Sequence, residues 1–421
     1  QDHLMSFKRY SRHERPYVPA TQSYWKDLPK RLHRSFDLSE FDVVVVHYSV
    51  RLSLTGHLSP TVAGKVELFR GLKVLFIQDE YENTEIARSW MDRLKFDFVY
   101  TCVPQQHVND IYPSWRFPAT TFVQTLTGYV HLDDEDRMVR PLRDRPFDIV
   151  YRGRSLHPVY GLLGQQKSRI GEEFRKLGLS RQLRVDIEID DHKRLYGDDW
   201  IRLLASARTT LGTESGSNVF DVDGSLRKKI DSALIADPEL SFEDIQETLL
   251  PAETIEMNQI SPKVFEAIRM RTALILIEGE YSGVLRPWDH YIPLKRDFSN
   301  VNECLDLIRD DDFLYAIVER AYRDIVESEV YSYGSFVSAF DETISSQLLH
   351  PVVEDRSLYS FFSLTKQGRI EATIPPSPRD PVGFIKANSD LPGALARQSE
   401  RESRELTFSS VAGDWLTTRF S

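Results

Sequence analysis

The chain has 421 residues, which is enough for two domains with separate hydrophobic cores, because a single core stops growing well below that length. Hydrophobic residues make up 41% of the chain, and no apolar run approaches the roughly 20 residues that span a bilayer. The formal net charge of −11 argues against a chain-wide nucleic-acid surface, which needs an excess of Lys and Arg.

Two cysteines, Cys102 and Cys304, lie far apart in mainly apolar segments, as expected of core thiols in a reducing compartment. The opening QDHLMSFKRYSRHERPYV lacks the apolar region of a signal peptide. We therefore expect a cytoplasmic protein, for which the basic residues within 8–15 leave open a peripheral contact with the inner face of a membrane.

The first half of the chain alternates strands with helices. Continuous β-branched runs such as VVVV mark strands that are buried on both faces of a parallel sheet, so a doubly wound sheet is predicted. The expected strands are 17–18, 41–48, 72–78 and 96–102, and the expected helices are 4–12, 62–69 and 84–94.

A second series follows a charged, proline-containing stretch at 131–146, which has the chemistry of a linker. Its expected strands are 147–151, 183–189, 209–212 and 273–277, its helices are 166–177, 200–207 and 262–270, two helices lie within 223–258, and an amphipathic pair lies within 301–328. We expect an N-terminal Rossmann-like acceptor domain (1–140), a C-terminal Rossmann-like donor domain (147–330), a helix crossing back (331–349) and a loosely ordered tail (350–421).

A small polar loop, GTESGSN, follows the strand at 209–212. In a parallel sheet such a loop lies at the carboxyl edge, where ligands bind. Glycine lets the backbone approach a ligand, and small polar side chains offer hydrogen bonds to phosphate or sugar oxygens. An ordinary strand-to-helix connection remains the alternative. The loop residues assigned to a ligand are Glu214, Ser215, Gly216, Ser217 and Asn218.

Two more segments are expected at the same edge. Arg152, Gly153 and Arg154 follow the strand at 147–151, and guanidinium groups match the oxygens of a diphosphate. Ser261 precedes Pro262 at the start of a helix whose free N–H groups favour an anion. Glu266, one turn further on, suits ribose hydroxyls, with a solvated helix carboxylate as the alternative. Together the three loops predict a site for a nucleoside diphosphate.

The order of the segments YRGR, LGTESGSNVFDVDG and ISPKVFEAIRMRTALILIEGEYSGVLRPWDHYIPLKRDFSNVNECLDLIRD resembles the donor domain of GT-B glycosyltransferases, of the "group 1" type found in bacterial polysaccharide biosynthesis. The resemblance covers about 147–344. It implies an α/β fold, GT-B, with two facing Rossmann-like domains, parallel sheets and an interdomain cleft. More faintly, DHLMSFKRYSRHERPYV resembles that fold's first helix and second strand, so its first strand is expected to be missing.

The same resemblance implies that Glu266 holds the donor ribose, and that the loop 278–283, with Ser282 and Gly283, lies near the donor phosphates or sugar. Ser261, Lys263, Phe265 and Arg271 are assigned to the same donor site. Two departures stand out. The acidic residue that retaining members carry eight positions before Glu266 is Asn258, and the usual small pair after the helix is Met270 and Arg271. Retention of anomeric configuration is nevertheless expected over inversion.

The segment 221–224, DVDG, imitates the acidic metal motif of other transferases and of phosphatases. The preceding SGSNVF is too polar for the strand that a phosphatase needs, and the glycine is misplaced for a calcium loop. We therefore expect no metal and no cofactor, with the nucleotide sugar acting as a substrate.

In the first half, His47 and the pair Asp79 and Glu80 end two strongly apolar strands. They are expected to face the donor loops across the cleft. The carboxylates suit an acceptor hydroxyl, or the general base of an inverting reaction. His47 is an alternative base, and a structural hydrogen bond is its other interpretation. Residues 126–130 are expected to line the hinge.

These features predict transfer of a sugar from a nucleoside-diphosphate sugar to a hydroxyl of a glycan or lipid-linked acceptor. Arg154, Arg152, Lys263 or Arg271 and the amino end of the helix at Ser261 would stabilise the leaving group in place of a metal. A non-catalytic module that binds sugar nucleotides and a sugar-nucleotide epimerase on the same fold remain open.

Overall fold

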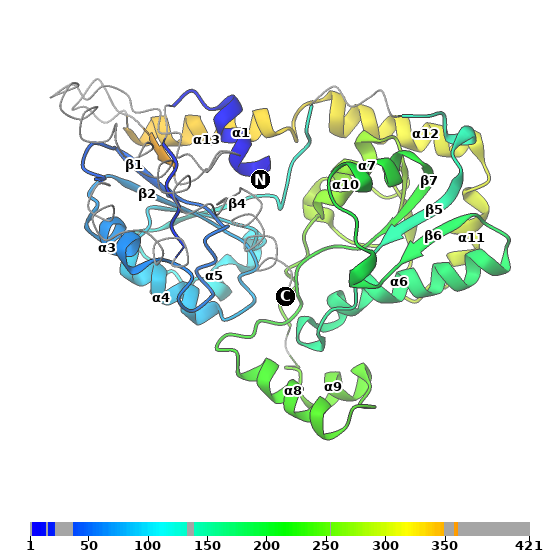
Figure 1. Cartoon of the computed structure of the whole chain (residues 1–421), viewed down its shortest axis with the longest axis horizontal. Helices are drawn as coiled ribbons and strands as arrows, with labels where there is room; N and C mark the ends of the chain where they lie inside the picture. The colour runs from blue at the N-terminus through cyan, green and yellow to red at the C-terminus, as the bar shows by residue number, and fades with distance from the viewer. Residues whose placement is uncertain are drawn as a thin grey trace, which may run out of the picture.

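The computed structural model describes residues 2–13, 16–21, 37–132, 139–252, 254–348 and 358–360, and these form two lobes side by side (Figure 1). The first sheet has the strand order β10-β1-β2-β3-β4, and the second sheet has the order β6-β5-β7-β8-β9. Every strand pair within the two sheets is parallel. The α/β fold class with two parallel sheets, expected of a GT-B protein, is therefore confirmed.

We call the part built on the first sheet the N-terminal lobe. Its strands are β1 (Val43–Val46), β2 (Leu72–Ile77), β3 (Phe98–Thr101), β4 (Thr121–Gln124) and β10 (Leu358–Ser360). Its helices are α1 (Asp2–Tyr10), α3 (Pro60–Leu68), α4 (Thr84–Leu94), the 3-10 turn Gln105–His107, α5 (Val108–Ile111) and α13 (Tyr333–Leu348).

The first sheet is buried on both faces, because successive side chains of a strand point into different cores. Val44 and Leu75 pack in one core with residues of α3 and α4. Val43 and Phe76 pack in the opposite core with α1 and with Phe336 of α13. Each fully buried aliphatic side chain contributes roughly 1.5–3 kcal/mol. The VVVV run therefore has no polar position, and α13 returns from the far end of the molecule to cover this sheet.

We call the part built on the second sheet the C-terminal lobe. Its strands are β5 (Phe147–Arg152), β6 (Val185–Glu188), β7 (Ala207–Gly212), β8 (Ala273–Ile277) and β9 (Ile292–Leu294). Its α-helices are α6 (Gly161–Ser180), α7 (Asp198–Ala205), α8 (Ser225–Ala236), α9 (Phe242–Thr248), α10 (Pro262–Arg269), α11 (Val301–Leu307) and α12 (Asp311–Tyr322). Shorter turns are Leu142–Asp144, Pro158–Tyr160, Asp191–Lys193, Tyr281–Gly283 and the π-helical Arg323–Glu327.

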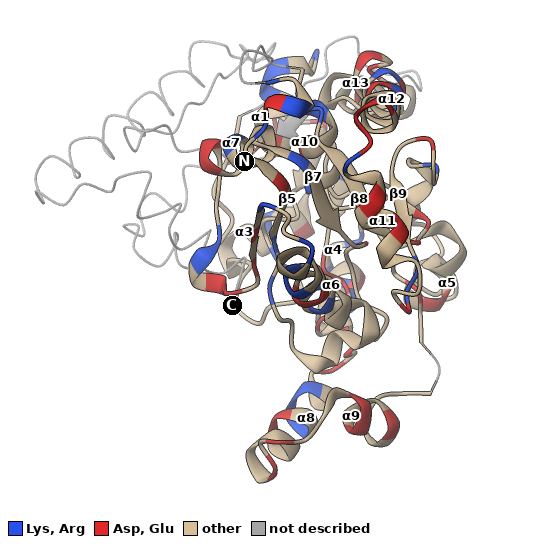
Figure 2. Ribbon diagram, turned by 90° about the vertical axis from the view of Figure 1, so that its right-hand side faces the viewer, with Lys and Arg blue, Asp and Glu red and all other residues tan. Residues whose placement is uncertain are grey.

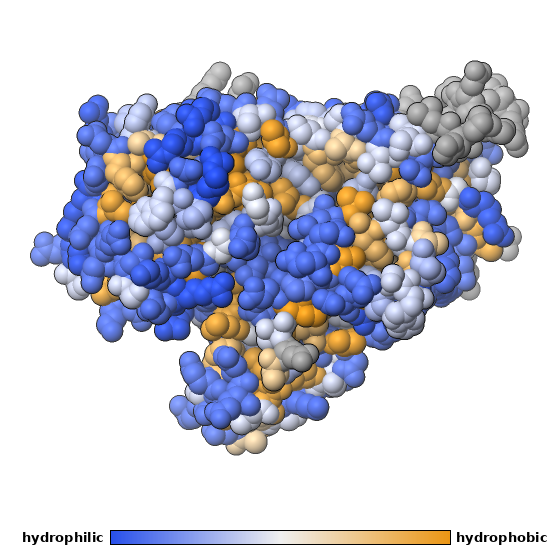
Figure 3. Space-filling model, turned by 180° about the vertical axis from the view of Figure 1, so that it is seen from behind, coloured by the Kyte–Doolittle hydropathy of each residue, from blue (hydrophilic) through white to orange (hydrophobic). Residues whose placement is uncertain are grey.

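Helices α8 and α9 form a hairpin that projects from the body of the molecule (Figures 1 and 2). Its small core contains Ile230 and Ile245, which pack with Val159. Seen from behind, hydrophobic residues gather where the hairpin meets the body (Figure 3). The hairpin is thus held to the C-terminal lobe by apolar contact, while its outer surface carries charges of both signs.

One strand prediction was wrong, and two strands were not predicted. Residues 17–18 form no strand, and the nearby Thr21 makes only an isolated antiparallel bridge to Leu58. Strand β4 was not expected, because its side chains are only half-buried or exposed and give no apolar run. Strand β9 was not expected either, since it has three residues with Pro293 at its centre.

Two predicted segments are only partly described. Within the expected linker 131–146, residues 133–138 lie outside the described residues, and Leu142–Asp144 forms a short turn. Within the expected tail 350–421, Leu358–Ser360 pairs with β1, and the remainder lies outside the described residues. None of the helices in the described part of the chain has the length and hydrophobicity needed to span a bilayer.

The two lobes are joined by backbone hydrogen bonds in a segment that we call the interlobe bridge, made of residues 81–85 and 221–222. The N–H of Asp221 donates to Tyr81 O at 2.9 Å, and the N–H of Asn83 donates to Asp221 O at 2.8 Å. The N–H of Glu85 donates to Val222 O at 2.9 Å. These bonds bring the end of β2 in one lobe beside the start of α8 in the other.

Candidate functional site

The central strands of the second sheet place three loops next to one another. Strands β5, β7 and β8 are neighbours and run parallel, so the loops that follow them leave the same edge of the sheet. These loops begin at Gly153, Thr213 and Glu278. The side chains that the sequence assigned to a donor site are therefore distributed along one edge, and their contacts decide which of them are available to a ligand.

Glu214 is buried, at 3% exposure, and links two of these loops. Its carboxylate accepts the backbone N–H of Tyr281 at 2.7 Å and the amide of Asn258 at 2.7 Å. A Cβ at Gly279 would lie 2.3 Å from the same carboxylate, so a larger residue there would displace it. Burial raises the pKa of Glu214, against the effect of these hydrogen bonds. Glu214 therefore fixes the loops, and Asn258 is its neutral hydrogen-bond donor.

The rest of the predicted polar loop is held by protein groups. Ser215 exchanges backbone hydrogen bonds with Gln259 at 2.7 and 2.9 Å. The hydroxyl of Ser217 is buried and donates to Val219 O at 2.6 Å. The side-chain oxygen of Asn218 accepts the N–H of Leu163 at 2.8 Å, which ties the loop to α6. Ser217 and Asn218 thus position the loop, in contrast to their predicted role as donors to a ligand.

A cluster of positive charges lies beside α10 at the carboxyl edge. Lys263 donates to Arg152 O at 2.8 Å, and its ammonium lies 5.1 Å from the ring centre of Trp200. The pKa of Lys263 is lowered to about 8, mainly by desolvation and to a smaller extent by the charges of Arg194 and Arg154. Lys263 is nevertheless accessible to solvent. We call Arg154, Lys167, Arg194 and Lys263 the cation cluster.

Lys167 is a member of this cluster that the sequence did not reveal. Its pKa is lowered to about 8 by desolvation and then by the charges of Lys263 and Arg154. Its carbonyl accepts the hydroxyl of Tyr151 at 2.8 Å, and a Cβ at Gly153 would lie 2.8 Å from the same oxygen. Gly153 therefore serves close packing of α6 against β5, which brings Lys167 to the edge of the sheet. In the sequence Lys167 is one of many polar residues of a helix.

Glu266 lies next to the cation cluster, one turn inside α10. Its carboxylate accepts the indole N–H of Trp200 at 2.7 Å. Burial raises the pKa of Glu266, while Trp200 and Lys263 lower it. The indole fixes one carboxylate oxygen, and the half-buried side chain keeps an accessible face. This arrangement is suited to accepting hydrogen bonds from vicinal hydroxyls.

Three residues assigned to the donor site have other partners. Phe265 is 2% exposed and belongs to the core beneath α10, because its position on the helix faces the sheet. Arg271, beyond the far end of α10, donates to Glu319 at 2.9 Å and stacks 3.6 Å over Tyr322. The guanidinium of Arg152 pairs with Asp186 at 2.8 Å. The assignment of these three side chains to the donor site is therefore corrected.

The remaining predicted residues shape the backbone at the start of α10. Ser261 occupies the N-cap position with extended backbone, but makes no side-chain cap. The N–H of Ile260 donates to the hydroxyl of Ser282 at 3.0 Å, which joins the loop after β8 to this start. Ser282 and Gly283 both have left-handed backbone, with φ of 56° and 73°. The loop after β8 therefore fixes the backbone at the amino end of α10, where the N–H of Val264 donates to Ser261 O at 3.0 Å.

From the N-terminal lobe, Asp79 faces the cluster. Asp79 is exposed, accepts the hydroxyl of Tyr81 at 2.8 Å, and attracts the ammonium of Lys167 electrostatically. Its φ of 58° is unusual for a non-glycine residue. The end of β2 thus presents one carboxylate across from the donor loops.

Glu80 and His47 do not reach the surface in this way. Glu80 is fully buried, accepts the hydroxyl of Thr101, and has its pKa raised to about 7 by burial. His47 is 6% exposed, and both ring nitrogens are engaged: Nδ1 by Ser49 at 2.8 Å and Nε2 by His3 at 3.0 Å. Their predicted catalytic roles are corrected, because neither side chain can contact an acceptor as placed. The structural interpretation of His47 agrees with these contacts.

The acidic segment 221–224 has a structural role. The carboxylate of Asp221 accepts the N–H groups of Leu226 at 3.1 Å and Arg227 at 3.0 Å, which caps the start of α8. Among the described residues, no group of three or more His, Cys, Asp or Glu side chains is arranged to hold a metal. Cys102 and Cys304 are buried, unpaired thiols, as the sequence indicated.

No protein-family model and no curated protein matches the sequence. Among solved structures, the chain is similar to HepE of Anabaena in complex with UDP, with a TM-score of 0.42 at 13% identity over 75% of this chain and 81% of that one. It is also similar to sucrose-phosphate synthase of Thermosynechococcus elongatus, with a TM-score of 0.42 at 10% identity over 76% of this chain and 77% of that one. A glycosyltransferase of Rickettsia africae is similar with a TM-score of 0.39 at 10% identity, over 74% of this chain and 78% of that one.

Proposed function

We propose that the chain is a glycosyltransferase that takes a sugar from a nucleoside-diphosphate sugar and transfers it to a hydroxyl of a glycan or lipid-linked acceptor. The observation that supports this proposal is the cation cluster beside the amino end of α10, with Glu266 one turn away. Desolvation and then neighbouring positive charges lower the pKa values of Lys167 and Lys263, and the four positive side chains together favour a multiply charged anion. A diphosphate with a ribose attached matches both parts of this arrangement.

In the proposed reaction, an acceptor hydroxyl oxygen forms a bond to the anomeric carbon of the donor sugar. The bond from that carbon to the diphosphate oxygen breaks, and the nucleoside diphosphate leaves with the electron pair. In the retaining course that the sequence favours, the acceptor proton passes to the departing diphosphate oxygen. Lys167, Lys263 and Arg154 stabilise the charge that develops on this oxygen, which is the role of a metal ion in other transferases.

Two acidic residues complete the proposal. Glu266 accepts hydrogen bonds from the ribose hydroxyls, with its second oxygen fixed by Trp200. Asp79 lies on the acceptor side, where it orients the attacking hydroxyl. We place the reaction in the cytoplasm, with at most a peripheral membrane contact, because both cysteines are buried thiols without a disulfide. Nucleic acid is not a proposed partner.

The test is a thermal-shift series of the full chain with UDP, GDP, dTDP, ADP and CMP, since a ligand that binds only the native state raises the Tm. We expect one nucleoside diphosphate to raise the Tm, and Glu266→Ala and Lys263→Met to remove most of the shift. The matched control Lys176→Met, on the exposed side of α6, should keep it. The shift should persist in EDTA.

Product analysis separates the related functions. Incubation with the matching sugar nucleotide alone should give slow hydrolysis to the nucleoside diphosphate and free sugar. Conversion into a second nucleotide sugar would identify an epimerase instead. Absence of a shift with every nucleotide would contradict the donor site itself.

A further inference from the structure

Helix α1 packs against the first sheet together with α13 (Figure 1). Its residues His3 and Phe7 are buried, and Phe7 belongs to the core that α13 completes. Just beyond the helix, Asp341 of α13 accepts the hydroxyl of Ser11 at 2.9 Å and the N–H of Arg12 at 2.7 Å. Helix α1 has only nine residues, and isolated helices of this length are marginal in water. Its helical structure therefore depends on docking.

Two imidazoles meet where α1 docks. His3 of α1 is 4% exposed, and His47, directly after β1, is 6% exposed. Nδ1 of His3 lies 3.0 Å from Nε2 of His47. The ring of His3 is also surrounded by aromatic rings with centres 5.0–6.4 Å away, those of Phe7, Tyr48, Phe76, Tyr333 and Phe336. The pair is therefore enclosed by α1, the end of β1, β2 and α13.

The surrounding hydrogen bonds determine where the protons of this pair lie. The backbone N–H of Ser49 donates to Nδ1 of His47 at 3.2 Å, so that nitrogen carries no proton. A neutral His47 then has its proton on Nε2, which donates to Nδ1 of His3. Nδ1 of His3 is thus an acceptor too. Both imidazoles are neutral in this arrangement, and each uses an unprotonated nitrogen as an acceptor.

Acid is incompatible with this hydrogen-bond pattern. Protonation of His3 places an N–H on Nδ1, directly opposite the N–H of His47. Protonation of His47 places an N–H on Nδ1, opposite the N–H of Ser49. Either event replaces an acceptor with a second donor and adds a positive charge inside the protein, which is costly. A state in which α1 is released and the imidazoles reach water takes up these protons more readily.

Other titratable groups reach the pair from several elements. Tyr48 stacks on His47 with ring centres 3.9 Å apart, and α13 contributes Tyr333. Burial raises the pKa of Tyr333, so it stays neutral in acid. The segment after β4 contributes His131, whose Nε2 lies 3.3 Å from the carboxylate of Asp2 on α1. A protonated His131 attracts Asp2 and opposes the release of α1, but this pair is partly exposed and contributes little.

Asp2 and His131 also connect α1 to the proposed donor site. The pKa of Glu266 in α10 is raised mainly by burial. Among the smaller influences, the charge of Asp2 raises it and that of His131 lowers it. The start of α1 therefore lies at the border between the lobes, within electrostatic reach of Glu266.

We propose that His3 and His47 form a pH-sensitive latch, which holds α1 against the first sheet while both imidazoles are neutral and releases it when they take up protons. Release uncovers the aromatic face of the sheet that α1 and α13 share, and it withdraws Asp2 from the surroundings of Glu266. The consequence for Glu266 rests on the proposed function, whereas the release itself does not.

The test is the rate at which a thiol on the buried face of α1 is modified. Ser6→Cys places a thiol of similar size there, because Ser6 is 5% exposed. The rate with a dithiodipyridine reagent is measured in the full chain at about pH 7.5 and about pH 5.5, on either side of the ordinary histidine pKa of roughly 6.5. It is divided by the rate in an unfolded peptide with the same sequence as α1, because the thiolate fraction changes with pH in both.

We expect the relative rate to rise by up to about a hundredfold at the lower pH, or about tenfold for each imidazole that takes up a proton on release. The sign follows from linkage, because the released state binds more protons than the docked state. The native thiols of Cys102 and Cys304 are buried and should stay protected at both pH values. Their protection shows that the release is local and that the lobes remain folded.

Variants in the Ser6→Cys background assign the response to the pair. His3→Asn and His47→Gln each remove one proton-binding group and keep a hydrogen-bonding atom in place of the ring nitrogen that joins the pair. Each should keep only about a tenfold response, and the double variant should show none. His131→Gln is the matched control, since it removes a neighbouring imidazole outside the pair, and it should keep the full response.

A relative rate that does not change with pH in the Ser6→Cys chain would overturn the latch, even if the histidine variants fail to dock α1. The same rise in the double variant, or its loss in His131→Gln, would overturn it as well. Modification of Cys102 and Cys304 together with Cys at position 6 would mean global unfolding and also contradict it. No nucleotide is needed for any of these readouts, so their outcome is independent of the thermal-shift test of the proposed function.

Discussion

At the scale of single residues, the two lysines of the cation cluster have a measurable consequence. Lys167 and Lys263 have pKa values of about 8 in the unliganded protein, lowered from the usual 10.5 mainly by desolvation. A bound diphosphate favours their charged forms and raises both pKa values. Above pH 8, binding therefore has to take up protons that the free lysines have lost.

We expect the affinity for the nucleoside diphosphate to be nearly constant around pH 7 and to fall above pH 8. For each lysine the loss approaches about tenfold per pH unit until the pKa of the bound state is reached. Isothermal titration calorimetry across this range measures it. Lys263→Met should bind more weakly at pH 7 and show a shallower decline, and Lys176→Met should behave as the wild type. An affinity independent of pH up to about 10 would contradict this account.

At the scale of elements, the loop after β7 depends on one glycine. Gly216 has a φ of 108°, and a Cβ there would lie 1.9 Å from Met257 O. Gly216→Ala should therefore lower the free energy of unfolding by about 2 kcal/mol or more, because it adds both strain and a clash. Urea unfolding measures the change.

The matched control is Gly64→Ala in α3, where a Cβ would meet nothing within 4 Å. Alanine at this half-buried position in the interior of α3 should stabilise the protein by roughly 0.5–1 kcal/mol relative to glycine. Equal effects of the two substitutions would show that the left-handed backbone at Gly216 is not required.

Elements with a strong apolar pattern could be predicted from the sequence, and short ones could not. The helix Thr84–Leu94 and the strand Ala273–Ile277 have the bounds expected from periodicity alone. Strand β4 could not be predicted because its side chains are half-buried or exposed. Strand β9 could not be predicted because it has only three residues, with a proline at its centre. Polar loop residues were the hardest to assign. Ser217 and Asn218 have the chemistry of ligand donors, but local backbone groups compete for the same hydrogen bonds.

At the scale of the whole molecule, a buried arginine ties the segment between the lobes to the C-terminal lobe. Arg145 is 1% exposed and donates to Ala207 O at 2.7 Å, Met270 O at 2.9 Å and Thr272 Oγ1 at 2.9 Å. Arg145→Met would leave these acceptors buried without donors. We expect it to lower the free energy of unfolding by about 3 kcal/mol or more, measured by urea unfolding.

The exposed neighbour Arg143 provides the control for this substitution. Arg143→Met should change the free energy of unfolding by less than about 0.5 kcal/mol, because exposed ion pairs contribute little. Similar stability of Arg145→Met and Arg143→Met would contradict the role given to Arg145.

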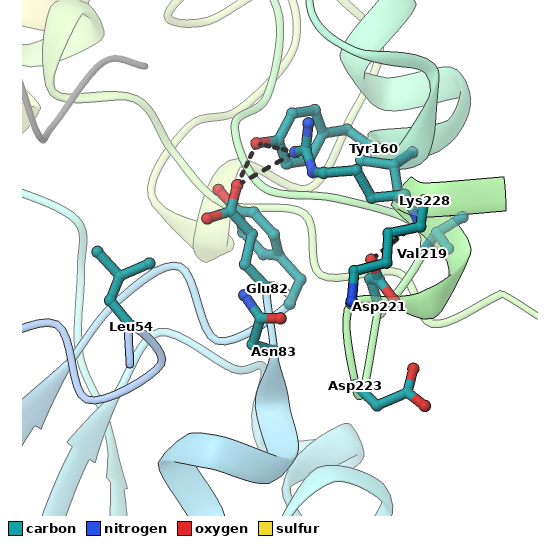
Figure 4. A pocket seen from close by; sticks show the side chains of 12 residues that line it. Leu54, Glu82, Asn83, Tyr160, Val219, Asp221, Asp223 and Lys228 are labelled. Carbon is teal, nitrogen blue, oxygen red and sulfur yellow. Dashed lines mark hydrogen bonds and ion pairs between the residues drawn. The ribbon is translucent and has the colours of Figure 1, made fainter. Parts of the chain in front are cut away.

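Sites formed by residues from distant segments or from both lobes could not be predicted from the sequence. Lys167 lies thirteen residues after Arg154, and only the packing of α6 on β5 brings it to the cation cluster. A cavity of about 370 Å³ between the lobes joins residues near 82 with residues near 227, and no local pattern indicates such a pairing (Figure 4). Sequence periodicity reports which face of an element is buried, but not which loops of two lobes meet.

Amide hydrogen exchange at the interlobe bridge provides a measure of how often the two lobes separate. The three N–H groups of the bridge, on Asn83, Glu85 and Asp221, donate only to backbone carbonyls of the facing segment. Separation of the two lobes breaks all three hydrogen bonds at once, so we expect a common exchange rate with deuterium that reports how often the lobes separate. Because these hydrogen bonds are made by main-chain atoms, substitutions that remove side chains leave the three amides available as probes. Ligands that hold the two lobes together should slow the exchange of all three amides together.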